Sequence, residues 1–154
     1  MRVVVGFSSG RSKSRLRLDL YIDGASKGNP GRASVGAVVK DARGRVLSEV
    51  SRPIGRATNN QAEYRALLCG LEEVSKIADS RPGNVDLVVK TDSQLLYRQM
   101  TGRYRTKNKI LISISVKVRT MLRELGSFSI EHIPREQNRY ADRLANLALS
   151  KKRS

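Results

Sequence analysis

The pattern of hydrophobic and polar residues becomes regular at residue 16 and predicts a series of strands. Residues 16–23 alternate between apolar and polar with a period of two, which is typical of a half-buried strand. Residues 33–40 and 45–51 predict two more strands, joined by a hairpin turn with the sequence Asp-Ala-Arg-Gly. The glycine-rich residues 24–31 predict a turn after the first strand. Three successive strands with short connections indicate an antiparallel meander.

Helices alternate with strands in the rest of the chain. Apolar residues at helical spacing predict a helix that begins near residue 59 and ends near residue 78. The apolar run at 85–90 predicts a strand buried on both faces, followed by a short helix to about residue 100. The remaining predicted elements are a basic connector at 101–109, a helix at 110–125, a strand at 127–133 and a last helix capped by Asn138. This order predicts an α/β (mixed α+β) fold, in which helices flank one five-stranded mixed sheet that begins with three antiparallel strands.

Composition indicates a nucleic acid as partner. The 154 residues include 30 Lys and Arg but 14 Asp and Glu, which gives a net charge of +16. Such a charge repels itself, and a polyanion would relieve the repulsion. The single cysteine and the single histidine exclude a disulfide within the chain and a zinc centre built on paired cysteines or histidines. No apolar run approaches the roughly 18 residues of a membrane span, so we expect no membrane partner.

The chain is expected to consist of one domain with two basic ends. We expect residues 1–15 to form a flexible basic arm, residues 16–150 the folded domain and residues 151–154 a basic tail. The first 17 residues contain five Lys and Arg, four serines and no acid, a composition that also resembles an organellar transit peptide. We prefer the simpler interpretation, a basic arm on an already basic protein. We expect a cytoplasmic protein, with organellar targeting by this segment as the alternative.

Four acidic residues lie where a charge needs a partner. Asp23 ends the first strand, Asp92 follows the buried strand, and Glu63 and Asp142 lie on or beside the apolar stripes of their helices. Each also has a purely structural explanation. Asp23 suits a turn, Glu63 a capping box with Asn60, Asp92 an N-cap, and Asp142 the positive end of a helix dipole.

Taken together, the four acids indicate a metal centre. Carboxylates that converge on one point cannot all ionise unless a cation neutralises them. Oxygen ligands of this kind suit Mg²⁺ or Mn²⁺. Two divalent ions about 4 Å apart can hold the attacking and leaving oxygens of a phosphodiester in line.

The acids lie in four motifs that resemble the type 1 ribonuclease H family. In chain order the motifs are YIDGASKGNPG at 21–31, TNNQAE at 58–63, TDS at 91–93 and PREQNRYADRLA at 134–145. The likeness extends over residues 17–149, and the four motifs in this order are specific although each alone is weak. The family fold is a five-stranded mixed sheet with helices, which agrees with the predicted order of elements.

The resemblance implies an endonuclease that hydrolyses the RNA strand of RNA–DNA hybrids and leaves 5′-phosphate and 3′-hydroxyl ends. It implies two Mg²⁺ ions, which Mn²⁺ could replace, held by the catalytic acids Asp23, Glu63, Asp92 and Asp142. His132 would assist proton transfer and product release, although a strand-end histidine without a catalytic part fits the position as well. We expect the protein to be a monomer.

The resemblance also implies a set of substrate contacts. Glycines let backbone N–H groups approach phosphates, and side-chain amides can bond to a 2′-hydroxyl. The residues expected to contact the substrate are Gly24, Ala25, Ser26, Lys27, Gly28, Asn29, Thr58, Asn59, Asn60 and Gln61. Turn and helix-cap roles fit the same residues, and both can hold at once.

The chain departs from many bacterial members between Asp92 and Asp142, where the segment is too short for a basic helical handle and contains no tryptophan. It resembles the handle-less branch of archaeal and some bacterial enzymes. Binding would then depend on the basic arm, the connector at 101–109 and the tail. The alternatives are a relaxed-specificity nuclease that cuts double-stranded RNA or DNA, a junction resolvase, and an inactive hybrid-binding module.

Overall fold

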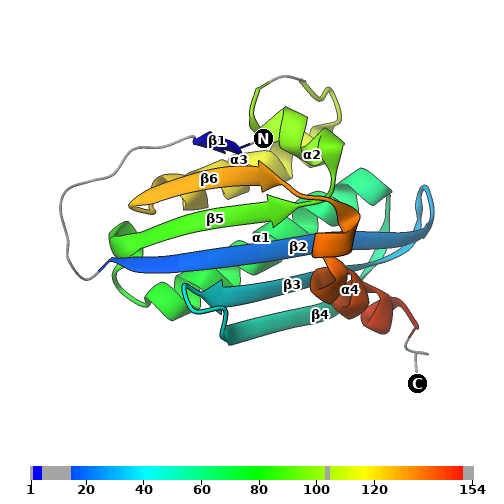
Figure 1. The fold of residues 1–154 in the computed structure, drawn as a ribbon. Helices are drawn as coiled ribbons and strands as arrows, with labels where there is room; N and C mark the ends of the chain where they lie inside the picture. The colour runs from blue at the N-terminus through cyan, green and yellow to red at the C-terminus, as the bar shows by residue number, and fades with distance from the viewer. Residues whose placement is uncertain (1, 5–14, 103–104, 151–154) are drawn as a thin grey trace.

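A mixed sheet of six strands forms the centre of the computed structural model, which describes residues 2–4, 15–102 and 105–150 (Figure 1). The strands are β1 (Arg2–Val4), β2 (Leu16–Gly28), β3 (Gly31–Asp41), β4 (Val46–Ala57), β5 (Val85–Thr91) and β6 (Ser127–His132). They are hydrogen-bonded in the order β1-β6-β5-β2-β3-β4. The helices are α1 (Asn59–Ala78), α2 (Gln94–Met100), α3 (Lys109–Arg123) and α4 (Arg139–Ser150), with short 3-10 helices η1 (Pro82–Asn84) and η2 (Arg135–Gln137).

The five predicted strands are confirmed, and a sixth is added at the edge of the sheet. Residues 2–4 were expected in a flexible arm but form β1, which pairs antiparallel with β6 and places Val3 opposite Ile130. Without this pairing, β6 would present an open row of backbone groups, which favours the addition of a strand. The rest of the arm at residues 5–14 and the tail at 151–154 lie outside the described residues.

The turn predicted at residues 24–31 is mostly strand. β2 continues to Gly28 in unbroken antiparallel register with β3, and only Asn29 and Pro30 remain as the turn. β4 likewise extends six residues beyond the predicted end at 51, because an edge strand tolerates Pro53 where the register with β3 shifts. The prediction was wrong here because pairing with a neighbouring strand outweighs the local turn preference of glycine.

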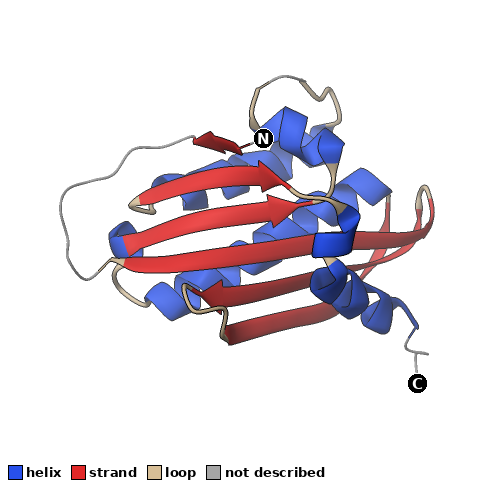
Figure 2. Cartoon of the chain, in the orientation of Figure 1, coloured by secondary structure: helices blue, strands red, loops and turns tan. Residues whose placement is uncertain are grey.

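Helices cover the two faces of the sheet unequally. α1 and α3 pack on one face, whereas α4 lies on the opposite face against β2, β3 and β4 (Figures 1 and 2). The main core lies between the sheet and α1, where Leu18, Leu20 and Ile22 are fully buried. Gly70 of α1 lets the helix approach the sheet, because a Cβ at this position would lie 2.6 Å from a methyl group of Leu20. No helix in the described ranges is long and apolar enough to span a bilayer.

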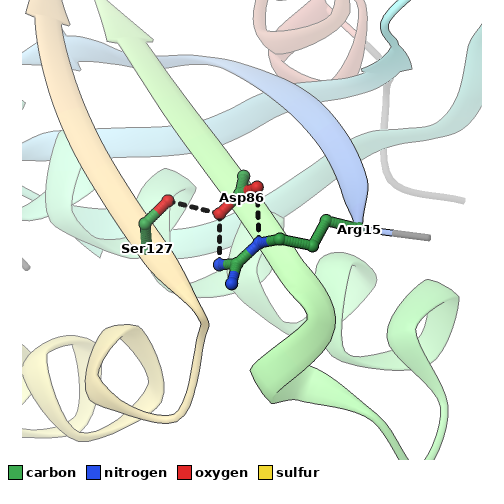
Figure 3. Close-up of polar contacts among 3 residues, drawn as sticks. All are labelled: Arg15, Asp86 and Ser127. Carbon is green, nitrogen blue, oxygen red and sulfur yellow. Dashed lines mark hydrogen bonds and ion pairs between the residues drawn. The ribbon is translucent and has the colours of Figure 1, made fainter. Parts of the chain in front are cut away.

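A polar cluster joins three parallel strands at their amino ends (Figure 3). The guanidinium of Arg15 donates two hydrogen bonds to Asp86 of β5, one of them 2.8 Å long from Nε, and Ser127 of β6 donates to the same carboxylate. These contacts, led by the hydrogen bonds from Arg15, lower the pKa of Asp86. Arg15 is therefore anchored to the sheet, although we expected it in the flexible arm.

Candidate functional site

Asp23 and Asp92 lie side by side because β2 and β5 are parallel and in register. The pairing of these strands ends with Ile22 opposite Thr91, and Asp23 and Asp92 are the next residues along the chain. Asp23 is 6% exposed and Asp92 is half-buried. The structural alternative for Asp92 is wrong, because the N-cap of α2 is Ser93, whose hydroxyl accepts a hydrogen bond from Leu96 N–H.

Glu63 reaches the same end of the sheet from α1. A Cβ on Gly24 would lie 2.5 Å from the backbone nitrogen of Glu63, so the helix meets the strand only because residue 24 is glycine. The Glu63 carboxylate, 9% exposed, accepts a hydrogen bond from Gly24 N–H. The capping box of α1 is formed by Thr58 and Gln61 rather than by Asn60 and Glu63.

Asp142 approaches from the other face of the sheet, on the first turn of α4. With Asp23, Asp92 and Asn59 it lines an open hollow of about 390 Å³. A side-chain hydrogen bond with Asp142 is one of the causes that raise the pKa of Asp23. All four predicted acids therefore converge, from two strands and two helices on opposite faces of the sheet.

The geometry of the carboxylates fits a divalent cation. One oxygen each of Asp23, Glu63 and Asp92 lies within 4.8 Å of the others, with Asp142 beside this group. Glu63 Oε2 is buried and has no hydrogen-bond partner among the described residues, which leaves an oxygen to ligate. Hard oxygen donors at this spacing are the ligands that Mg²⁺ and Mn²⁺ prefer.

The carboxylates destabilise one another when no cation is present. Burial, and then the charge of Glu63, raise the pKa of Asp23 far above its usual range. Burial is also the main cause of the raised pKa of Glu63 and of Asp92. The site therefore holds protons near neutral pH that a divalent cation would displace.

Asn138 is a site residue whose role the sequence did not reveal, since it was expected only to cap the last helix. It is 1% exposed, and its Nδ2 donates to the carbonyl of Ile22 at 2.8 Å. A side-chain hydrogen bond from Asn138 also opposes the effect of burial on the pKa of Asp92. Asn138 thus ties the segment before α4 to Ile22 within β2 and to Asp92 after β5, and no periodicity in the sequence signals this contact.

Two further residues beside the acids were not predicted as site residues from the sequence. Asn146 Nδ2 donates to the Asp142 carboxylate at 3.1 Å and so orients it. Arg135 lines the same hollow, and its charge lowers the pKa of Asp92. The spacing of four residues between Asp142 and Asn146 on one helix is the signal that predicts their contact.

His132 lies next to the acid cluster at the end of β6. It pairs in register with Thr91, and its Nε2 lies 3.3 Å from the carbonyl oxygen of Asp92. Its ring packs at 5.9 Å against the ring of Tyr97. The histidine is half-buried beside Asp92, a position compatible with proton transfer, and its catalytic role stays a prediction.

The predicted substrate contacts divide into two groups. Gly24, Ala25, Ser26 and Asn59 line the hollow that holds the acids. The others lie around it: Lys27, Gly28 and Asn29 at the β2–β3 hairpin, and Thr58, Asn60 and Gln61 at the start of α1.

The two segments that supply these contacts are fastened together. Asn29 Oδ1 accepts from Asn59 N–H at 2.9 Å, and Ser26 Oγ donates to Ala57 O at 3.0 Å. Thr58 and Gln61 are engaged in the capping box, which confirms the structural alternative for these two residues. Nucleic acid contact by any of them stays a prediction.

Comparison with known proteins agrees with this geometry. A family model described as reverse transcriptase-like matches residues 21–148. A ribonuclease HI of Halobacterium salinarum is 44% identical over 133 residues, which are 86% of this chain and 64% of that protein. The bifunctional protein Rv2228c of Mycobacterium tuberculosis is 41% identical over 135 residues, 87% of this chain and 36% of that protein. The chain thus spans less than two thirds of the length of these relatives.

A solved structure is similar to this chain over most of its length. The crystal structure of LC11-RNase H1 in complex with an RNA/DNA hybrid superimposes with a TM-score of 0.80 at 38% identity and covers 86% of this chain and 96% of that one. The matched region includes all four acid motifs, and their carboxylates converge at one end of the sheet. The chain belongs to the type 1 ribonuclease H family.

Proposed function

We propose that this protein is a divalent-metal-dependent endonuclease that hydrolyses the RNA strand of RNA–DNA hybrids. The observation that carries the proposal is the convergence of the carboxylates of Asp23, Glu63 and Asp92 within 4.8 Å, with Asp142 in the same hollow. The hybrid seen with LC11-RNase H1 supports the choice of substrate. The intact set of four acids argues against an inactive binding module.

Each acid has a role that follows from its position. Asp23, within β2, and Asp92, directly after β5, are held by these parallel strands and present oxygens to the same point. Glu63 and Asp142 close this point from α1 and α4. When bound, a pair of divalent ions supplies Lewis-acid activation of the attacking water and stabilises the leaving 3′-oxygen. Breaking the P–O3′ bond while water adds to phosphorus gives 5′-phosphate and 3′-hydroxyl ends.

The remaining residues of the site would position the substrate and move protons. Ser26 and Asn59 line the hollow beside the acids and would contact the sugar–phosphate backbone, where a side-chain amide can recognise a 2′-hydroxyl. His132, next to Asp92, would take a proton from the attacking water or give one to the leaving oxygen. We propose Mg²⁺ as the resident ion, with Mn²⁺ as a substitute, because both accept carboxylate oxygens.

A labelled RNA–DNA hybrid tests the proposal. We expect cleavage in Mg²⁺ or Mn²⁺, none in EDTA, and loss to background in Asp23→Asn and Asp92→Asn. Asp79→Asn is the matched control, because Asp79 is an exposed acid at the far end of α1. Undiminished cleavage by Asp23→Asn, or no cleavage by the wild type with either ion, would overturn the proposal. Parallel reactions with all-RNA duplex, all-DNA duplex and a four-way junction define the substrate.

A further inference from the structure

A second hollow, of about 480 Å³, adjoins the acid site and is lined by three arginines. Its lining is Arg135, Glu136, Arg139, Asp142 and Arg143. Arg135 and Asp142 also line the hollow that contains the carboxylates. The two hollows therefore meet at these two residues, and a strand that crosses the acids can continue directly into the second.

The three arginines are exposed, and within the described residues none has a carboxylate oxygen at salt-bridge distance. Arg139 is the first residue of α4 and Arg143 follows one turn later. Cations near a helix N-terminus are opposed by the helix dipole, so this placement costs stability. Neither helix formation nor ion pairing accounts for the arrangement.

Arg143 is held in place by an aromatic ring rather than by an acid. Its guanidinium lies 5.1 Å from the ring centroid of Tyr140, and the Tyr140 hydroxyl donates to Glu49 of β4. Lys40 of β3 approaches the same ring at 5.5 Å. Stacking on a ring orients a guanidinium while its N–H groups stay available.

We propose that Arg135, Arg139 and Arg143 form a phosphate-binding track for the backbone of the cleaved strand, next to the scissile phosphate. A guanidinium fits phosphate oxygens through two parallel hydrogen bonds, which makes arginine the suitable residue for such a track. The strand is the cleaved one because the track joins the acid hollow directly. The inference rests on the proposed function for the identity of that strand, and it supplies part of the binding that a handle provides elsewhere in the family.

Salt-dependent binding tests the track without any cleavage. The full chain and its double variant Arg139→Gln/Arg143→Gln are titrated against a labelled hybrid in EDTA, over a series of monovalent salt concentrations. Each phosphate contact contributes about 0.9 to the slope of log K against log salt concentration. We expect the variant to bind more weakly and its slope to be less steep by about 1.8. An unchanged slope and affinity would overturn the proposal.

Two control variants separate charge from packing and from overall basicity. Arg139→Lys/Arg143→Lys keeps both charges and is expected to keep most of the slope, whereas a loss as large as that of the glutamine variant would refute the electrostatic account. Arg43→Gln/Arg81→Gln removes the same net charge from exposed connections at the opposite end of β2 and is expected to bind like the wild type. Equal weakening in this control would show that net charge alone matters and would also overturn the track.

The assignment to the cleaved strand and the proposed function fail in different ways. With neutral methylphosphonate linkages in the DNA strand, the difference in slope between wild type and variant is expected to persist; its disappearance would assign the track to the other strand and refute this part. Because binding is measured without divalent ions, a wild type that binds with the expected slope but cleaves nothing would reject the nuclease and keep the track. Cleavage by the wild type, together with an unchanged slope in the variant, would keep the nuclease and reject the track.

Discussion

Asp23 lies directly opposite Gly36 in the antiparallel pairing of β2 and β3. A Cβ on Gly36 would lie 2.2 Å from the carbonyl oxygen of Ala141 and 2.6 Å from the nitrogen of Ala145. The missing side chain on β3 therefore lets α4 rest on the sheet at the position that brings Asp142 to Asp23. One glycine thus couples the packing of α4 to the assembly of the acid cluster.

Gly36→Ala is expected to displace α4 and impair both stability and activity. Overpacking of this kind costs about 1–3 kcal/mol of unfolding free energy. Urea unfolding measures the loss, and hybrid cleavage in saturating Mg²⁺ measures the effect on Asp142. Gly83→Ala is the control, because a Cβ there meets no atom within 4 Å. Equal stability of the two variants would contradict the coupling.

Asn138→Ala is expected to lower stability and turnover together. The substitution removes the hydrogen bond from Nδ2 to the carbonyl of Ile22, a loss of about 0.5–1.5 kcal/mol. It also removes a hydrogen bond to Asp92, so the carboxylate is held less firmly. Thermal unfolding and single-turnover cleavage report the two effects. Gln137→Ala is the control, because Gln137 is the exposed neighbouring residue and its substitution should change neither quantity. If Asn138→Ala left both stability and turnover unchanged, the contact would contribute no energy.

The metal-free protein is expected to lose stability as pH rises toward neutrality. The pKa of the Glu63 carboxyl is 4.5 in the unfolded chain, and burial raises it to about 8 in the folded protein. Between these values the folded state binds more protons than the unfolded state, so the unfolding free energy falls with rising pH, by up to about 1.4 kcal/mol per pH unit for each proton.

Urea unfolding in EDTA across this pH range measures the decline. Asp23→Asn should flatten it, because the variant removes one of the coupled carboxyl groups. Saturating Mg²⁺ should also flatten it by neutralising the cluster. A stability that rises over the same range in EDTA would contradict the burial of uncompensated carboxyls.

His132→Ala is expected to slow cleavage by about 10²-fold if the histidine transfers protons, at little cost in stability. The ring is half-buried and contacts Tyr97, so thermal unfolding is measured alongside to confirm an intact fold. Single-turnover cleavage of a labelled hybrid measures the rate. A variant with wild-type rates would leave His132 a structural residue at a strand end.

Arg15→Gln is expected to lower the melting temperature above pH 5, with a difference that shrinks in acid. Asp86 has a lowered pKa in the folded state, so its contribution to stability is present above the unfolded value of 3.8 and is lost as pH falls through the folded value. Arg56→Gln is the control, because Arg56 is an exposed arginine on β4, which β2 and β3 separate from β5. A pH-independent difference would show that Arg15 acts through packing rather than through its ion pair.

Several of the site's features followed from local sequence alone. The period of two before Asp23 and the helical spacing around Glu63 predict their elements correctly, because hydrophobic periodicity reports which face of an element is buried. The parallel pairing of β2 with β5, which brings Asp23 beside Asp92, was not predicted, because the order of elements along the chain does not state which strands are neighbours. The extension of β2 to Gly28 could not be predicted from local sequence, because it depends on pairing with β3.

From residue 16 onward, the sequence by itself determined the order of strands and helices, the four acids and their divalent-metal chemistry, since each is encoded in short segments. Only the tertiary structure decided that Asp142 comes within reach of Asp23, that Asn138 faces inward and that three arginines line a hollow next to that of the acids. The physical reason is steric. Gly24 and Gly36 allow helices from opposite faces to meet the same strands, and such close approach is a property of distant backbones that no local periodicity contains.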